Sequence, residues 1–185
     1  MPHHVRKSRV ELALRESPLA WTIVQPAMYI QTPLAFLNDR RDELNPGFDA
    51  KQPFTPIDLE DLADAITDIV IKHGHEFATY ELAGSETLTF VDMAAAISEA
   101  LGKTVRARSV PAQHFVDTRG AARGFGPSAL LELRAMLDYY NDHGLVGNGN
   151  VLRMILKRDP TTFLAAAKRE LTSRVVGDAS KRSVS

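Results

Sequence analysis

Apolar residues along the chain follow helical spacings of three and four, interrupted by short unbroken apolar runs, and this pattern predicts helices separated by buried strands. The clearest helix begins at Asp58 and ends at Gly74. Its apolar stripe consists of Leu59, Leu62, Ala63, Ile66, Ile69 and Val70. A second helix is expected from Thr89, a capping residue, to Gly102. Further helices are expected at residues 5–16, 27–37 with an interruption at Pro33, 112–122, 127–140, 151–156 and 161–173.

Three short runs rich in β-branched and aromatic residues predict strands at Trp21–Pro26, Phe77–Leu82 and Val105–Val110. Because helices separate these runs, the strands are expected to pair in parallel, as in βαβ units. The fold class is therefore α/β, although about three strands make a small sheet for so many helices. Residues 38–56 are expected to form an acidic surface loop.

Composition limits the classes of function. The 185 residues include 22 Lys and Arg against 23 Asp and Glu, a formal charge of −1, so no overall basic field favours nucleic acid. The chain has no Cys, which excludes disulfides, thiolate nucleophiles and Cys-based zinc sites. The amino end lacks a signal-peptide pattern and no run of about 18 apolar residues occurs. We therefore expect a cytoplasmic protein with no nucleic-acid and no membrane partner.

Charge is unevenly distributed along the chain. Residues 39–68 contain nine acids and three bases, whereas residues 151–185 contain eight bases and three acids. Such asymmetry is typical of two solvated faces, and this is how we interpret it. His73 and His75 could suggest a metal, but a metal site needs three or four converging ligands. Only Glu76 lies near them in sequence, so we expect no metal site.

Lys7 is a first candidate for chemistry. It shares a stripe of the first predicted helix with Val10, Glu11 and Leu14, because residues three and four apart are neighbours on a helix. This placement turns an ammonium toward the interior, where it can donate hydrogen bonds to a ribose or an enolising oxygen. The alternative is a lysine whose stem packs on apolar surface while its head reaches water. The spacing alone leaves both open.

Five stretches of the sequence carry a resemblance to a known family. They are His3–Glu11, Trp21–Tyr29, Phe54–Ala65, Tyr80–Glu86 and His143–Gly147. In their order and spacing they resemble the NmrA-like family, which belongs to the atypical short-chain dehydrogenase/reductases. The resemblance covers nearly all of the first 165 residues. It implies a Rossmann-like parallel sheet, present here in part, with a helical carboxyl-terminal subdomain on the substrate side.

The resemblance also implies roles for individual residues. His3 occupies the position of the catalytic tyrosine of the superfamily, and Lys7 that of the lysine that binds the nicotinamide ribose. The residues at the end of the first predicted strand and just after it, Pro26, Ala27, Met28 and Tyr29, would approach the nicotinamide. Histidine departs from the dehydrogenase pattern because it lacks the phenol that donates a proton at neutral pH. The implied protein is therefore either an oxidoreductase or a redox sensor that binds NAD(P), with NADP favoured, and the implied substrate is a small carbonyl compound or quinone.

A dinucleotide site also needs a strand, a glycine-rich turn and a helix amino end that together hold the pyrophosphate. None of the eleven glycines forms that arrangement. We therefore expect a fragment of a longer protein, with Met1 at an internal position, that binds the cofactor weakly or not at all by itself. Residues 1–110 would belong to the cofactor domain, residues 111–176 to a helical substrate-side subdomain, and residues 177–185 to a disordered tail.

A second hypothesis belongs to another class of function. A sheet that lacks its leading strands exposes an edge and apolar faces, and such surfaces favour association. The chain would then be a non-enzymatic interaction or dimerisation module, and a homo-oligomer would be possible.

Overall fold

The computed structural model describes residues 2–182, with side chains described from residue 5 to residue 172. The strands are β1 (Thr22–Pro26), β2 (Glu43–Leu44), β3 (Ala78–Leu82) and β4 (Arg106–Ala107). The helices are α1 (Pro2–Arg15), α2 (Gln31–Leu34), α3 (Leu59–Ile71), α4 (Phe90–Leu101), α5 (Ala112–Phe115), the π-helical turn Val116–Gly120, α6 (Pro127–His143), α7 (Asn150–Leu156) and α8 (Phe163–Arg182). No helix within the described residues is long and apolar enough to span a membrane.

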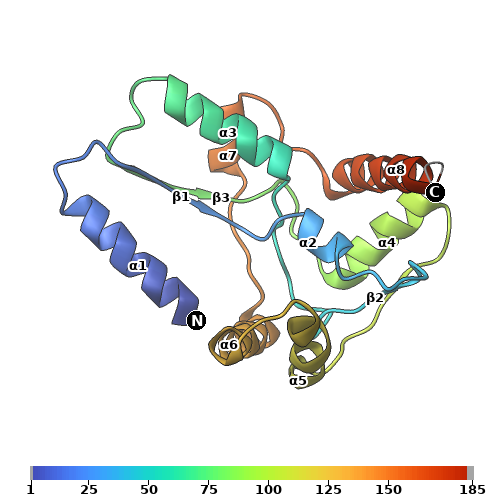
Figure 1. Cartoon of the computed structure of the whole chain (residues 1–185). Helices are drawn as coiled ribbons and strands as arrows, with labels where there is room; N and C mark the ends of the chain where they lie inside the picture. The colour runs from blue at the N-terminus through green and yellow to red at the C-terminus, as the bar shows by residue number, and fades with distance from the viewer. Residues whose placement is uncertain (1, 183–185) are drawn as a thin grey trace.

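The centre of the α/β arrangement is a parallel pair of strands. β1 and β3 pair in register from Thr22 opposite Ala78 to Pro26 opposite Leu82. In Figure 1, α3 and α7 lie on one side of this pair and α1 lies on the other. Apolar residues of α3 and α7, including Leu62 and Leu152, pack together with Leu82 of β3 in one buried cluster. The predicted α/β class and the parallel pairing are thus confirmed.

The third predicted strand differs from the expectation in length and in partner. Only Arg106 and Ala107 are extended as β4, and they pair with β2 instead of with the β1–β3 pair. β2 lies inside the stretch that we expected to be a loop. It is anchored by Leu44, which is 0% exposed, and one apolar residue among acids is too weak a pattern to predict a strand.

Residues 27–37 are also less helical than their composition suggests. The backbone N–H of Ile30 donates to the carbonyl of Ile57 at 2.9 Å, and the N–H of Ile57 donates to the carbonyl of Met28 at 2.8 Å. These long-range bonds hold residues 28–30 alongside the segment before α3, so the helix is confined to α2. Tertiary hydrogen bonds override local propensity here.

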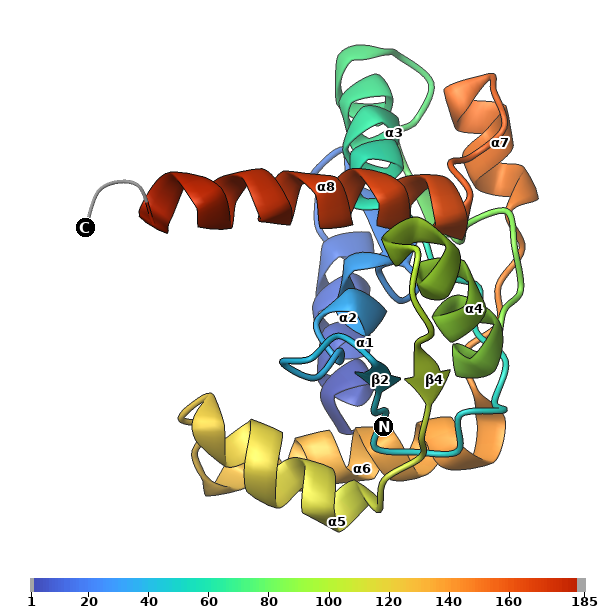
Figure 2. The same ribbon diagram turned by 90° about the vertical axis from the view of Figure 1, so that its right-hand side faces the viewer.

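The main hydrophobic core combines elements from both of the expected segments, 1–110 and 111–176. Its aromatic members are Phe36, Phe48, Phe54, Phe90, Phe115 and Phe163. Figure 2 shows α4 packed against α8, with α5 and α6 together at the base of the molecule. α8 continues to Arg182, where we expected a tail from Gly177, and residues 183–185 lie outside the described part of the chain. The main core therefore joins residues of the first segment to the carboxyl-terminal helices, while the β1–β3 pair packs in the second cluster with α3 and α7.

Candidate functional site

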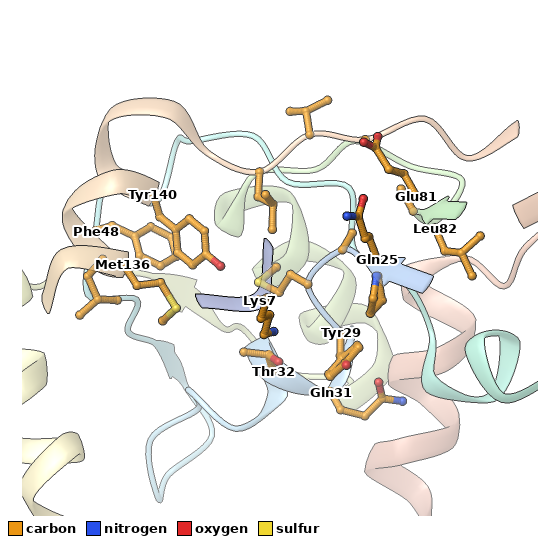
Figure 3. Close-up of a pocket in the computed structure, with 18 of the residues that line it drawn as sticks. Lys7, Gln25, Tyr29, Gln31, Thr32, Phe48, Glu81, Leu82, Met136 and Tyr140 are labelled. Atoms are coloured by element: carbon orange, nitrogen blue, oxygen red, sulfur yellow. The ribbon is translucent and has the colours of Figure 1, made fainter. Parts of the chain in front are cut away.

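A cavity of about 890 Å³ opens at the carboxyl ends of β1 and β3. Its walls come from α1, the end of β1 and the segment that follows, the end of β3, α6 and the loop after α6. Figure 3 shows side chains from these elements arranged around the cavity. In open α/β sheets, ligands bind outside the carboxyl ends of the strands. The position of this cavity makes it the candidate functional site.

One wall is the segment Pro26–Tyr29, and all four of its residues line the cavity. The fold fixes this segment at both ends. The N–H of Ala27 donates to the carbonyl of Leu82 at 2.8 Å, which continues the β1–β3 pairing by one residue. The Met28 carbonyl and the residue after Tyr29 are held by Ile57, as described above. The backbone of this wall is therefore rigid, while the Tyr29 side chain remains 38% exposed toward solvent.

α1 contributes the polar side of the cavity. Lys7, Ser8 and Glu11 line it from successive turns of this helix. Glu11 is held in place because Gln25 on β1 donates to both of its carboxylate oxygens, at 2.9 and 3.0 Å. Lys7 is exposed, and Figure 3 draws it among the residues that line the cavity. The structure thus brings Lys7 and the Pro26–Tyr29 segment to one cavity.

His3 is the remaining residue that the sequence singled out. Its backbone lies in α1, one helical turn before Lys7, but its side chain lies outside the described residues. Its role stays a prediction. His75, one of the two histidines considered for a metal, instead contacts the hydroxyl of Tyr80 through Nδ1 at 2.9 Å.

The wall opposite Pro26–Tyr29 is apolar and aromatic. Phe36, Phe48, Phe115 and Tyr140 line it, together with Leu133, Met136 and Leu137 of α6. Arg119 fastens this wall, because its guanidinium donates to the carbonyls of Ala35 and Phe36 at 2.7 and 3.0 Å. The same guanidinium lies over the rings of Phe36 and Phe115. The aromatic side of the cavity is therefore locked to the segment after α2.

The loop after α6 closes the cavity with help from two glycines. Gly144 has a φ of +63° and ends α6, and a side chain there would collide with the carbonyl of Pro53. Gly147 lines the cavity, and a Cβ at this position would lie 2.7 Å from the Cβ of Ala83. The loop can approach the end of β3 this closely only because residue 147 has no side chain.

Behind α2 lies a polar network that supports the cavity. Gln31 lines the cavity and donates to Asp58 at 2.9 Å. The carboxylate of Asp58 is fully buried and pairs with Arg169 of α8 at 2.7 Å. Burial alone would raise the pKa of Asp58, but hydrogen bonds from Arg169 and Gln31 outweigh burial and lower it. Asp58 is therefore a buried carboxylate that ties α8 to the cavity wall.

This network corrects our interpretation of the charge asymmetry. The acidic stretch 39–68 and the basic stretch 151–185 are not two separate solvated faces, because their side chains pair with each other. Arg158 binds Asp61 and Asp64, each at 2.8 Å, and Arg169 binds Asp58 and Glu60 at 2.7 and 2.9 Å. Opposite charge in two stretches of one chain was the signal that could have indicated this contact.

Sequence reasoning missed Gln31, Phe48 and Tyr140 as lining residues. Gln31 and Phe48 lie in segments that we expected to be helix and surface loop, so neither was considered. Tyr140 lies in α6, whose pattern of apolar residues predicted a packed helix and did not mark any of its residues as part of a site. It could have been found only by asking which aromatic residues of that helix carry a hydroxyl.

A parallel strand pair with helices on both sides and a cavity at its carboxyl ends defines a Rossmann-like α/β protein. Within this class, the chain matches the NmrA-like family over residues 1–170. The chain belongs to the NmrA-like family, and the resemblance noted in the sequence is confirmed.

Three known proteins show how far the similarity extends. An NAD(P)H azoreductase of Xenophilus azovorans is 32% identical over 96 residues, which cover 50% of this chain and 33% of the azoreductase. An NADPH-dependent quinone oxidoreductase from Escherichia coli, crystallised with NADPH, has a TM-score of 0.73 at 21% identity, covering 87% of this chain and 57% of the oxidoreductase. NmrA, a negative transcriptional regulator crystallised with NAD, has a TM-score of 0.62 at 18% identity, covering 91% and 58%. The chain thus spans less than two thirds of each relative's length.

Proposed function

We propose that this chain forms the nicotinamide and substrate side of an NAD(P)H-dependent oxidoreductase that reduces a small planar acceptor such as a quinone, another carbonyl compound or an azo compound. The observation that carries the proposal is the convergence of Lys7 and Pro26–Tyr29 on one cavity at the carboxyl ends of parallel strands. The names of the azoreductase and of the quinone oxidoreductase support the reaction class.

The residues present suit a nicotinamide riboside. Lys7 has no hydrogen bond or ion pair to other side chains in the described range, so its ammonium is available to ribose hydroxyls. Pro26 and Met28 contribute apolar lining on a backbone that is held by Leu82 and Ile57. Gly147 lets the loop after α6 pack closely on the end of β3 and line the cavity there. These features fit a ring with a ribose attached.

Each of these residues would act by placing reactants. Lys7 would orient the ribose, and the rigid Pro26–Tyr29 wall would hold one face of the ring. The aromatic wall, with Phe48 and Phe115, would exclude water and stack a planar acceptor on the other side. The bound cofactor supplies the hydride. The balanced reaction is NAD(P)H plus acceptor plus one proton, giving NAD(P)⁺ and the reduced acceptor.

We further propose that the chain by itself binds the whole cofactor weakly, and that NADPH is preferred over NADH only where the adenosine half of the cofactor is also held. The sequence contains no glycine-rich turn between a strand and a helix amino end. Gly84, which follows β3, packs against the Pro56 carbonyl and leaves no space for a phosphate at that point. The similar quinone oxidoreductase from Escherichia coli is NADPH-dependent, which supports NADPH as the cofactor.

Titration of the purified chain with NADPH and with NADH, followed by nicotinamide fluorescence, tests the binding proposal. We expect a weak signal of similar strength for both cofactors, because they differ only in a phosphate on the adenosine half, for which this chain offers no partner. Consumption of NADPH in the presence of a quinone supports an oxidoreductase, whereas binding without consumption supports a redox sensor. A tight, saturable NADPH signal from this chain would contradict the claim that it lacks a pyrophosphate site.

A second candidate is an interaction or dimerisation module. Val5, Val10 and Leu12 of α1 are each more than half exposed, as is Leu19 after it. Apolar side chains at this density on one exposed helix favour association. Sedimentation equilibrium tests this candidate, which requires a dimer that Val10→Asp and Leu12→Asp together dissociate; a monomer across the concentration range would exclude self-association.

A further inference from the structure

The ring of Tyr140 is held firmly by other aromatic side chains. It lies edge-on to Phe48, with ring centroids 5.8 Å apart and planes at 79°, and edge-on to Phe54, at 5.5 Å and 81°. Phe54 itself is 0% exposed. Edge-to-face contacts of this kind fix a ring in direction as well as in position. The direction of the Tyr140 hydroxyl is therefore set by the core.

The hydroxyl of Tyr140 has no hydrogen-bond partner among the residues that the structure describes. No hydrogen bond joins it to any backbone or side-chain group in the described part of the chain. Figure 3 shows its oxygen directed toward the middle of the pocket, away from the packed ring. The hydroxyl of a buried tyrosine usually has a hydrogen-bond partner. The Tyr140 hydroxyl faces the cavity, so a ligand in the cavity could be that partner.

Tyr140 also stays protonated, which makes it a donor. Burial raises the pKa of its phenol above the usual value of 10.0, and the neighbouring Tyr139 adds to this effect. At neutral pH the group therefore offers an O–H in an apolar surrounding. A donor in such surroundings interacts more strongly with an acceptor than the same donor in water does.

The geometry of the cavity leads to a specific role for this group. We propose that the Tyr140 hydroxyl donates a hydrogen bond to an acceptor atom of a planar aromatic substrate, such as a quinone carbonyl oxygen. The inference rests on the proposed function, because it takes the cavity as the substrate site. In that reaction the acceptor atom gains negative charge as hydride arrives, and a preorganised donor stabilises this charge.

The test compares two ligands and two variants by isothermal titration calorimetry on the full chain, without cofactor. The ligands are 1,4-naphthoquinone and naphthalene, which share a fused ring but differ in the carbonyl oxygens. The variants are Tyr140→Phe and Tyr139→Phe. Tyr139 is adjacent in α6, is 39% exposed and does not line the cavity. The absence of Cys removes thiol addition to the quinone as a source of heat.

We expect Tyr140→Phe to weaken naphthoquinone binding by roughly 3- to 10-fold, the loss typical of one neutral hydrogen bond, and to leave naphthalene binding unchanged. Tyr139→Phe should affect neither ligand. Equal weakening of both ligands would mean that Tyr140 only shapes the cavity, and would overturn the proposal. An unchanged naphthoquinone affinity, or no binding of naphthoquinone to the wild-type chain, would also overturn it. Because no cofactor is present, failure of hydride transfer would not alter this result.

Discussion

Lys7 and Tyr140 reach the cavity from different walls and differ in how firmly the fold holds them. Lys7 extends from an exposed helix that contacts the rest of the molecule sparingly, at points such as the ion pair between Arg6 and Glu132. Tyr140 is embedded among Phe48 and Phe54. Substitution of Lys7 should therefore affect binding alone, because nothing in the core depends on it.

Lys7→Ala should weaken NADPH binding about 10-fold, which is the loss expected for a hydrogen bond from a charged donor. Its free energy of unfolding should change by less than about 0.5 kcal/mol, as for other exposed positions. Fluorescence titration and urea unfolding measure the two effects. Lys51→Ala is the matched control, since Lys51 is exposed and does not line the cavity. Equal NADPH affinity in both variants would exclude Lys7 from the cofactor site.

At the scale of elements, local signals predicted some structures well and others not at all. The helix from Thr89 to Gly102 has its capping box and its left-handed final glycine, as expected. These signals act within a few residues and are visible in sequence. The segment 27–37 could not be predicted in the same way, because its shape is set by hydrogen bonds to Ile57. Pro26–Tyr29 lines the cavity, and the role that the family resemblance implies for it toward the nicotinamide stays a prediction.

Thr89→Ala should lower the free energy of unfolding by about 1 kcal/mol, the usual effect of removing a helix cap. The Thr89 hydroxyl accepts from the N–H of Asp92 at 3.1 Å, and the Asp92 carboxylate accepts from the N–H of Thr89 at 2.9 Å. Thr67→Ala serves as control, because Thr67 is an exposed residue inside α3. Urea denaturation should show the loss for Thr89 only, and equal curves would refute the capping role.

For the whole molecule, the contact between the acidic and basic stretches matters most. α8 is distant in sequence from Gln31 of the cavity wall. Arg169 of α8 nevertheless forms an ion pair with Asp58, and Asp58 accepts a hydrogen bond from Gln31. The counts of charged residues identified both stretches. They could not show that the stretches pair, because a count does not say which residues are close together in the folded chain. The same limit explains why the aromatic wall was missed, since Phe48 and Tyr140 are adjacent only in the folded chain.

Asp58→Asn should destabilise the protein by about 2–3 kcal/mol at pH 7, because it leaves Arg169 without its buried partner. The pKa of Asp58 in the folded state is lowered below 3.8. The ion pair therefore contributes stability above about pH 4, and this contribution is lost as pH falls through the folded-state pKa. Chemical denaturation at pH 7 and at pH 3 should show a smaller pH effect in Asp58→Asn than in wild type. Asp64→Asn, at an exposed ion pair, should behave like wild type at both pH values.

The central claim is that this chain carries the nicotinamide side of a cofactor cleft and no pyrophosphate site. The most direct test is NMR titration with reduced nicotinamide mononucleotide and with NADPH, following the backbone amides of Ala27, Met28 and Tyr29. We predict that both ligands shift these amides and that their dissociation constants agree within about 3-fold, because the adenosine phosphate half finds no partner. NADPH binding about 100-fold tighter than the mononucleotide, or shifts that leave these three amides unchanged, would contradict the account.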